Sequence, residues 1–229
     1  MIIKGFQTLT LLDFPGKTAC TVFTAGCNYR CPFCHNALLV TEIGDDEYTE
    51  EEIFAHLKRR KNVLDGVAIT GGEPLMQKDI ERFMYEIKDM GYAVKLDTNG
   101  SFPDKLKDIL ALNLADYVAM DVKNCKERYG ETVGLKNFDV KPVEESIDIL
   151  MNSGVDFEFR TTVTKNFHTL EDMEKLAQWI KGDEKYFLQN FVDSGNLIDS
   201  SCKGVFKKQM EEMLTAVKKY VPNAQLRGI

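Results

Sequence analysis

Three cysteines lie within eight positions of the segment TAGCNYRCPFCHN, residues 24–36. Cys27, Cys31 and Cys34 form the pattern C-x3-C-x2-C. Closely spaced thiolates are ligands for zinc or for an iron–sulfur cluster, and such centres usually take four protein ligands. The chemistry of this segment therefore depends on what supplies the fourth ligand.

The rest of the chain leaves three interpretations of the three cysteines: a zinc site, a redox dithiol and an iron–sulfur cluster. Zinc requires a further Cys or His, yet His35 adjoins Cys34 and is awkwardly placed. His56 and His168 are distant in sequence and are predicted on helices. A thioredoxin-type C-x2-C dithiol would leave Cys31 without a role. An iron–sulfur cluster held by three cysteines would keep one iron open, as catalytic metal sites generally do.

Other chemically reactive residues are predicted to be structural. Cys20, Cys125 and Cys202 are scattered, and each is expected to be a small buried or loop residue rather than a ligand. His168 precedes a predicted helix and is expected in its cap region or on the surface.

Polar clusters occur where predicted strands end. TGGEP (70–74) follows the second strand, DTNG (97–100) follows the third, and DVK (121–123) ends the fourth. Arg160 lies in the fifth strand and Gln189 near the end of the sixth. Enzymes with parallel sheets build their active sites at the C-terminal ends of the strands. These clusters therefore predict one catalytic face.

The elements that must position these residues alternate along the chain. Strands are predicted at 18–24, 63–69, 92–96, 115–122, 155–163 and 185–191. Five helical stripes lie between or after them. The first consists of Ile80, Phe83, Met84 and Ile87 and is closed by Gly91, and the others begin at Leu106, Val143, Met173 and Met210. This alternation predicts an α/β fold with a parallel sheet. Six units are too few for a closed eight-stranded barrel, which leaves an open partial barrel or a doubly wound sheet. We predict an open partial (β/α)6 barrel, with residues 1–229 as a single domain.

Composition excludes several classes of protein. The net charge of −7 lacks the basic footprint of a nucleic-acid-binding protein. No apolar run is long enough for a membrane span or a signal peptide. We therefore expect a cytoplasmic protein that binds neither nucleic acid nor membrane, and in that compartment thiols favour metal centres over disulfides.

The cysteine pattern, with Phe33 before its last cysteine, resembles that of the radical S-adenosylmethionine (SAM) superfamily, and GGEP strengthens the resemblance. The segment GFQTLTLLDFPGKTACTVFTAGCNYRCPFCHN, with DTNG and DVK, resembles the glycyl-radical activating enzymes. Within them it is most similar to the activating proteins of anaerobic ribonucleoside-triphosphate reductase, relatives of pyruvate formate-lyase activating enzyme. The resemblance covers nearly the whole chain.

This resemblance implies what supplies the fourth ligand of the metal centre. SAM would chelate the open iron of a [4Fe-4S] cluster through its amino and carboxylate groups. Reductive cleavage would then produce methionine and a 5′-deoxyadenosyl radical. Cys27, Cys31 and Cys34 would ligate the cluster, and Phe33 would lie beside the adenine. Lys123 would offer a cation to the methionine carboxylate.

The strand-end motifs would hold SAM. Gly71, Gly72 and Glu73 would meet the methionine amino group, because glycines let the backbone approach closely. The methionine and ribose region would be lined by Asp97, Thr98 and Asn99.

Four polar residues complete the site that the resemblance implies. Asp97 and Asp121 match an acidic pair that holds a monovalent cation in pyruvate formate-lyase activase. A structural ion pair between Asp121 and Lys123 is the alternative. Arg160 and Gln189 are expected beside the cofactor.

The leading hypothesis is an enzyme that installs a glycyl radical on a partner, namely anaerobic ribonucleoside-triphosphate reductase. Because residues 36–48 contain no cysteine, we expect one cluster and an external electron donor such as flavodoxin or ferredoxin. The alternative is a radical SAM enzyme acting on a small molecule, as 7-carboxy-7-deazaguanine synthases do; DTNG and DVK favour the first. A non-catalytic iron–sulfur electron carrier would have no use for the strand-end motifs.

Overall fold

One eight-stranded sheet organises the protein, in the order β1-β2-β3-β4-β5-β6-β7-β8. The computed structural model describes residues 1–41, 44, 47–182, 185–193 and 195–228. β1 is antiparallel to β2, and the other neighbouring strands of the sheet pair in parallel. The strands are β1 (Ile3–Thr10), β2 (Ala19–Thr24), β3 (Gly66–Gly71), β4 (Ala93–Thr98), β5 (Tyr117–Asp121), β6 (Asp156–Val163), β7 (Tyr186–Asn190) and β8 (Gln225–Arg227).

The six predicted strands are present as β2 to β7, but the count of six is wrong. β1 was missed because its middle residues are partly or fully exposed and its pairing with β2 contains register shifts, so its sequence shows no clean alternation. β8 has three residues, which is too short to show a period. The parallel core is therefore the predicted (β/α)6 unit, extended by one strand at each edge.

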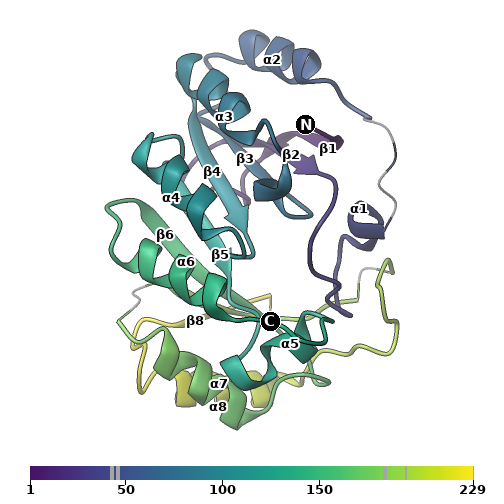
Figure 1. Ribbon diagram of the computed structural model, residues 1–229, viewed down its shortest axis with the longest axis vertical. Helices are drawn as coiled ribbons and strands as arrows, with labels where there is room; N and C mark the ends of the chain where they lie inside the picture. The colour runs from purple at the N-terminus through teal and green to yellow at the C-terminus, as the bar shows by residue number, and fades with distance from the viewer. Residues whose placement is uncertain (42–43, 45–46, 183–184, 194, 229) are drawn as a thin grey trace.

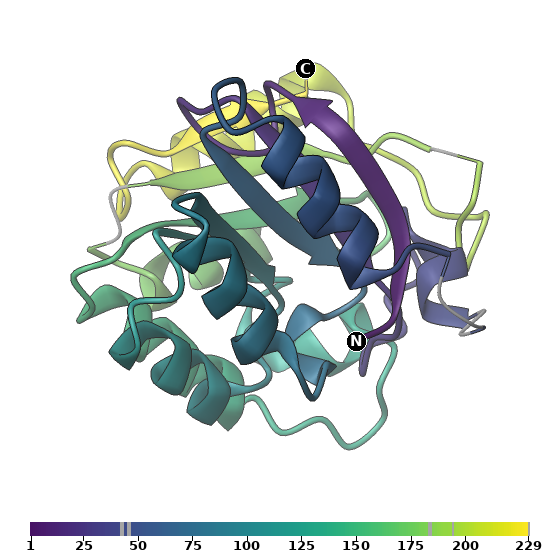
Figure 2. The same ribbon diagram turned by 90° about the horizontal axis from the view of Figure 1, so that it is seen from above.

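The five predicted helical stripes form α3, α4, α6, α7 and α8. Figure 1 shows α2, α3, α4, α6 and α7 in sequence order along one outer side of the sheet, and α2 and α3 lie in front of the strands in Figure 2. The helices are α1 (Ala37–Thr41), α2 (Glu50–Arg59), α3 (Ile80–Asp89), α4 (Pro103–Ala111), α5 (Tyr129–Thr132), α6 (Lys141–Met151), α7 (Leu170–Trp179) and α8 (Lys207–Val217), with 3-10 turns η1 (Pro74–Met76) and η2 (Lys126–Arg128).

The two faces of the sheet carry different side chains, because successive residues of a strand point to opposite sides. In β4, Val94 and Leu96 belong to the main hydrophobic core, whereas Asp97 lines a cavity on the other face and contacts Lys95. Polar residues continue along this inner face in β5, β6 and β7, at Asp121, Glu158, Arg160, Thr162 and Gln189. The fold thus places apolar residues against the helices and charged residues inside the curve of the sheet.

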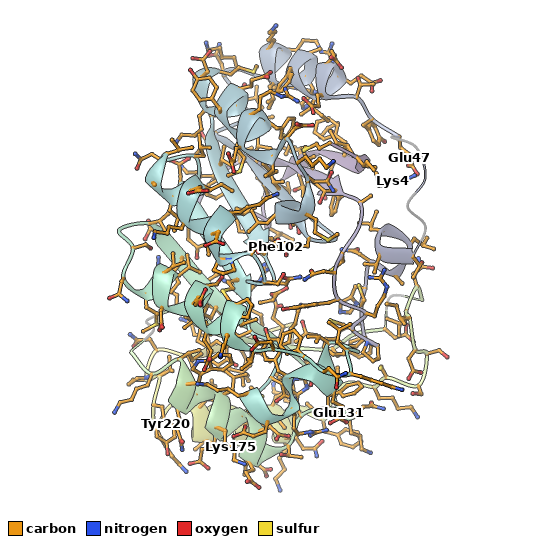
Figure 3. The ribbon with its side chains drawn as sticks, viewed as in Figure 1. Lys4, Glu47, Phe102, Glu131, Lys175 and Tyr220 are labelled. Carbon is orange, nitrogen blue, oxygen red and sulfur yellow. The ribbon has the colours of Figure 1, made fainter. Side chains whose placement is uncertain are left out.

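The sheet is open, since in the described residues no ladder joins the edge strands β1 and β8. The N-terminal edge is tied to the segment before α2 by a bridge between Ile3 and Tyr48. Lys4 Nζ also lies 3.7 Å from Glu47 Oε1, and Figure 3 shows these two side chains together. The predicted partial barrel is confirmed. Among the described residues, no helix has the length and apolar character needed to cross a bilayer.

Candidate active site

A cavity of about 250 Å³ lies at the C-terminal ends of the parallel strands. The cysteine segment forms one wall, and residues at or just beyond the ends of β3 to β7 form the others. Its lining residues are Cys27, Tyr29, Cys31, Phe33, Cys34, His35, Asn36, Val40, Thr70, Gly71, Gly72, Asp97, Thr98, Asn99, Asp121, Lys123, Arg160, Thr162 and Gln189. The structure therefore brings together every predicted site residue except Glu73.

Long-range backbone contacts hold the cysteine segment in place. The Gly26 amide donates to the Leu39 carbonyl at 2.7 Å, and the Arg30 amide donates to the Val133 carbonyl at 2.9 Å. Gly134 has a φ of +71°, and a Cβ there would lie 2.3 Å from the Arg30 carbonyl oxygen. The α5 region can approach the cysteines this closely because residue 134 has no side chain.

The three cysteines fit a cluster better than a single metal ion. Among the described residues, no three His, Cys, Asp or Glu side chains are grouped so that they could hold one ion. A four-iron cluster binds each cysteine at a different iron, which suits sulfurs spread along a cavity wall. Burial raises the pKa of Cys27 to about 11 and that of Cys31 to about 12. Both are thiols at neutral pH without metal, so ligation must release their protons.

Two glycines bring the β3 loop against the cysteine segment. Gly71 has a φ of +118°, and a Cβ there would lie 2.3 Å from the Thr24 carbonyl oxygen. At Gly72 a Cβ would lie 1.9 Å from the Gly26 carbonyl oxygen. A side chain at either position would clash with backbone, so both glycines are required by packing as well as by any ligand.

Glu73 is not among the residues that line the cavity, and its predicted contact with the methionine amino group stays a prediction. Its side chain is fully buried. It accepts hydrogen bonds from the Leu75 amide at 3.0 Å, the Thr98 hydroxyl at 2.9 Å and the Asn99 amide at 2.7 Å. Burial raises the pKa of Glu73 to about 7 in spite of these donors. The carboxyl group joins the loop after β3 to the loop after β4.

We predict that Glu73→Ala destabilises the metal-free protein by about 3 kcal/mol at pH 5, because buried donors lose their acceptor. The pKa of this acid is raised on folding, so its stabilising effect is complete below pH 4.5 and is lost as the pH rises through about 7. The loss caused by the substitution should therefore be smaller at pH 8. Urea denaturation of Glu73→Ala and of the exposed control Glu145→Ala measures this difference. Equal free energies of unfolding for the two variants would contradict the prediction.

Charged residues form a row across the cavity floor. Arg160 Nε lies 3.0 Å from Asp121 Oδ1, and Arg160 Nη1 lies 3.4 Å from Asp97 Oδ2. Lys123 Nζ lies 2.9 Å from Asp121 Oδ2, while Lys95 pairs with Asp97. Although burial opposes ionisation, Arg160 and Lys123 hold the pKa of Asp121 at about 2. A guanidinium thus bridges the two acids, the ion pair considered for Asp121 and Lys123 is present, and a monovalent cation at the acids stays a prediction.

His168 lies neither on a helix nor on the surface, so these two expectations are wrong. It precedes α7 and is 4% exposed. Its Nδ1 accepts from the Thr164 amide at 3.1 Å, so Nε2 carries the proton and donates to the Lys123 carbonyl at 2.8 Å. Its ring also lies edge-on to Phe33, with centroids 6.3 Å apart. Burial lowers the pKa of His168, so the neutral ring supports two residues that line the cavity.

Six residues that line the cavity were not predicted individually as site residues. These are Tyr29, His35, Asn36, Val40, Thr70 and Thr162. Thr162 could have been predicted from the strand period, since it lies two residues after Arg160 on the same face, and Thr70 belongs to the predicted TGGEP cluster. Cys20, Cys125 and Cys202 are buried and line no part of the cavity, as expected of structural cysteines.

The family model described as Radical SAM superfamily matches residues 21–180. The chain belongs to the radical SAM superfamily. Members of this superfamily use a [4Fe-4S] cluster and SAM, so the cofactor prediction is confirmed at that level. The fold agrees: SuiB from Streptococcus suis, solved with SAM bound, superposes with a TM-score of 0.71 over 90% of this chain at 14% identity. This radical SAM chain matches 49% of SuiB. Because the two sequences are 14% identical, the likeness concerns the fold alone.

Relatives of known name point to one branch of the radical SAM superfamily. A Methanocaldococcus jannaschii protein, provisionally named a glycyl-radical enzyme activating enzyme, is 33% identical over 100% of this chain and 96% of its own length. Pyruvate formate-lyase-activating enzyme from Clostridium pasteurianum is 28% identical over 93% of this chain and 98% of its own. 7-Carboxy-7-deazaguanine synthase from Koribacter versatilis is 31% identical over 70% of this chain and 67% of its own. The first two of these matches cover at least 93% of this chain, and both relatives are named as activating enzymes.

Proposed function

We propose that this radical SAM protein generates a glycyl radical on a partner enzyme, and that the partner is anaerobic ribonucleoside-triphosphate reductase. The observation that carries the proposal is a single cavity in which three cysteines face the charged ends of β4, β5 and β6. The whole-length similarity to activating enzymes supports the choice of reaction. The whole chain, 1–229, acts as one catalytic unit.

The cysteine wall is the proposed cluster site. Cys27, Cys31 and Cys34 ligate a [4Fe-4S] cluster, and Phe33 lies beside the adenine. When bound and reduced, the cluster supplies the electron that cleaves SAM into methionine and a 5′-deoxyadenosyl radical. The absence of cysteine from residues 36–48 supports a single cluster served by flavodoxin or ferredoxin.

The strand ends are the proposed SAM site. The carbonyls of Gly71 and Gly72 accept from the methionine amino group, and Lys123 meets its carboxylate. Asp97, Thr98 and Asn99 border the methionine and ribose. Arg160 and Gln189 complete the floor, where Arg160 also neutralises the two acids that it bridges.

We predict that Asp97→Ala weakens SAM binding about tenfold, because the variant removes a charged hydrogen-bonding partner and frees Lys95 and Arg160 to rearrange in the cavity. The cluster content should stay unchanged, since Asp97 is not a ligand. Equilibrium binding of SAM to the anaerobically reconstituted variant measures the effect.

Asp104→Ala is the matched control for Asp97→Ala. Asp104 is an exposed acid in the first turn of α4 and does not line the cavity. SAM affinity in this variant should equal that of the wild type. Equal losses at both positions would show that the strand-end cavity is not the SAM site.

The second candidate is a radical SAM enzyme that acts on a small molecule. The similarity to 7-carboxy-7-deazaguanine synthase favours it, although over less of the chain. The deciding experiment is an anaerobic mixture of reduced enzyme, SAM and purified reductase. Electron paramagnetic resonance (EPR) should show a glycyl radical on the reductase, and its absence favours the second candidate.

A further inference from the structure

The sulfur of Cys27 accepts hydrogen bonds from two directions. The Tyr29 amide donates to Cys27 Sγ at 3.4 Å, and Asn99 Nδ2 lies 3.7 Å from the same sulfur. In the part of the chain that the structure describes, Cys31 and Cys34 receive no comparable side-chain donor at sulfur. Among the three proposed cluster cysteines, Cys27 is thus the one whose sulfur accepts from an amide side chain in the described residues.

A ring of polar side chains fixes the direction of the Asn99 amide. Asn99 Oδ1 accepts from the Ser101 amide at 3.0 Å and also from the Ser101 hydroxyl. Asn99 Nδ2 donates to Asn28 Oδ1 at 2.9 Å, and Asn28 Nδ2 donates to Ser101 Oγ at 2.8 Å. Two donors at Oδ1 exclude the flipped amide, because only an oxygen can accept both. The NH2 group must therefore face the Cys27 sulfur.

The ring joins two loops that are far apart in sequence. Asn28 belongs to the cysteine segment, while Asn99 and Ser101 follow β4. Asn99 is 5% exposed, and hydrogen bonds are electrostatically stronger in such surroundings than in water. A small change in the geometry of the ring would therefore change the strength of the hydrogen bond to the Cys27 sulfur.

We propose that Asn28 and Ser101 are positioning residues that hold the Asn99 amide against Cys27 and thereby raise the reduction potential of the cluster. Reduction adds one electron to the [4Fe-4S] centre, and hydrogen bonds to its sulfurs stabilise the added negative charge. The ring makes the cluster easier for a donor to reduce. This proposal rests on the cluster assignment but is independent of the partner's identity.

The test is a redox titration of the reconstituted protein with dithionite and mediators, without SAM or partner, followed by EPR of the reduced cluster. Ser101→Ala removes the hydroxyl and loosens the ring. This variant should lower the equilibrium constant for reduction of the cluster about tenfold. For a one-electron step, its reduction potential would then be about 59 mV more negative than that of the wild type. Ser101→Thr keeps the hydroxyl and should restore the wild-type potential. Asn28→Ala should shift the potential in the same direction as Ser101→Ala.

Ser200→Ala is the matched control, because Ser200 is exposed in the loop between β7 and α8. The reduction potential of the cluster in this variant should equal that of the wild type. An intact cluster with an unchanged or more positive potential in Ser101→Ala overturns the proposal. Loss of the cluster in both Ser101→Ala and Asn28→Ala, with normal assembly in Ser101→Thr, would also overturn it, since the ring would then serve assembly. Each of these results is obtained without a partner and so leaves the glycyl-radical function separately testable.

Discussion

Replacing Cys31 with serine should leave a folded protein without an iron–sulfur cluster and with SAM cleavage reduced to background. Cys31 is 8% exposed on the cavity wall. A serine hydroxyl is a harder and far less acidic ligand than a thiol, so it should not hold iron in this position. The same loss is expected for Cys27→Ser and Cys34→Ser.

The measurement is iron and sulfide analysis after anaerobic reconstitution. The wild type should hold about four irons and four sulfides per chain, and air should bleach the centre because one iron lacks a protein ligand. Circular dichroism of the metal-free variants checks that they fold.

A triple variant, Cys20→Ala, Cys125→Ala and Cys202→Ala, is the control for the ligand assignment. These cysteines are buried away from the cavity, so the triple variant should assemble a full cluster. A folded triple variant without a cluster would show that the ligands have been assigned wrongly.

Mixing the reduced enzyme with SAM and the anaerobic ribonucleotide reductase subunit of the same organism should produce an EPR doublet. The doublet comes from coupling of the unpaired electron to the remaining α-hydrogen of a glycine. Oxygen should then cut the reductase chain at that glycine. Without the reductase, SAM cleavage should be slow and no doublet should form.

A glycine suits this reaction for physical reasons. A backbone radical there is stabilised by the flanking amides, and no side chain blocks the approach. The glycine must leave its own protein as a loop to reach the cavity, and the sheet of the activating enzyme is open at the edges β1 and β8. Cys31→Ser is the negative control for the radical. If no glycyl-radical protein of the host changes SAM turnover or gives a doublet, the proposed function is wrong.

Local sequence patterns were sufficient to predict the parallel core and most of the cavity. Apolar runs rich in β-favouring residues marked β2 to β7, and helical stripes marked the covering helices. Because parallel strands end at one edge of a sheet, DTNG and DVK could be placed together before any contact was known. The cysteine motif could be recognised because its three cysteines lie close together in the sequence.

The tertiary structure alone decided what each polar side chain contacts. Glu73 was predicted beside SAM, and only the structure shows that its side chain accepts from two amides and a hydroxyl of two loops. His168 was expected in a helix cap region or on the surface; it does precede the N-cap of α7, but it is buried and donates to the carbonyl of Lys123. Arg160 bridges two acids, Asp97 and Asp121, from neighbouring strands. These roles depend on distances between segments up to 63 residues apart in the chain, which no local period encodes.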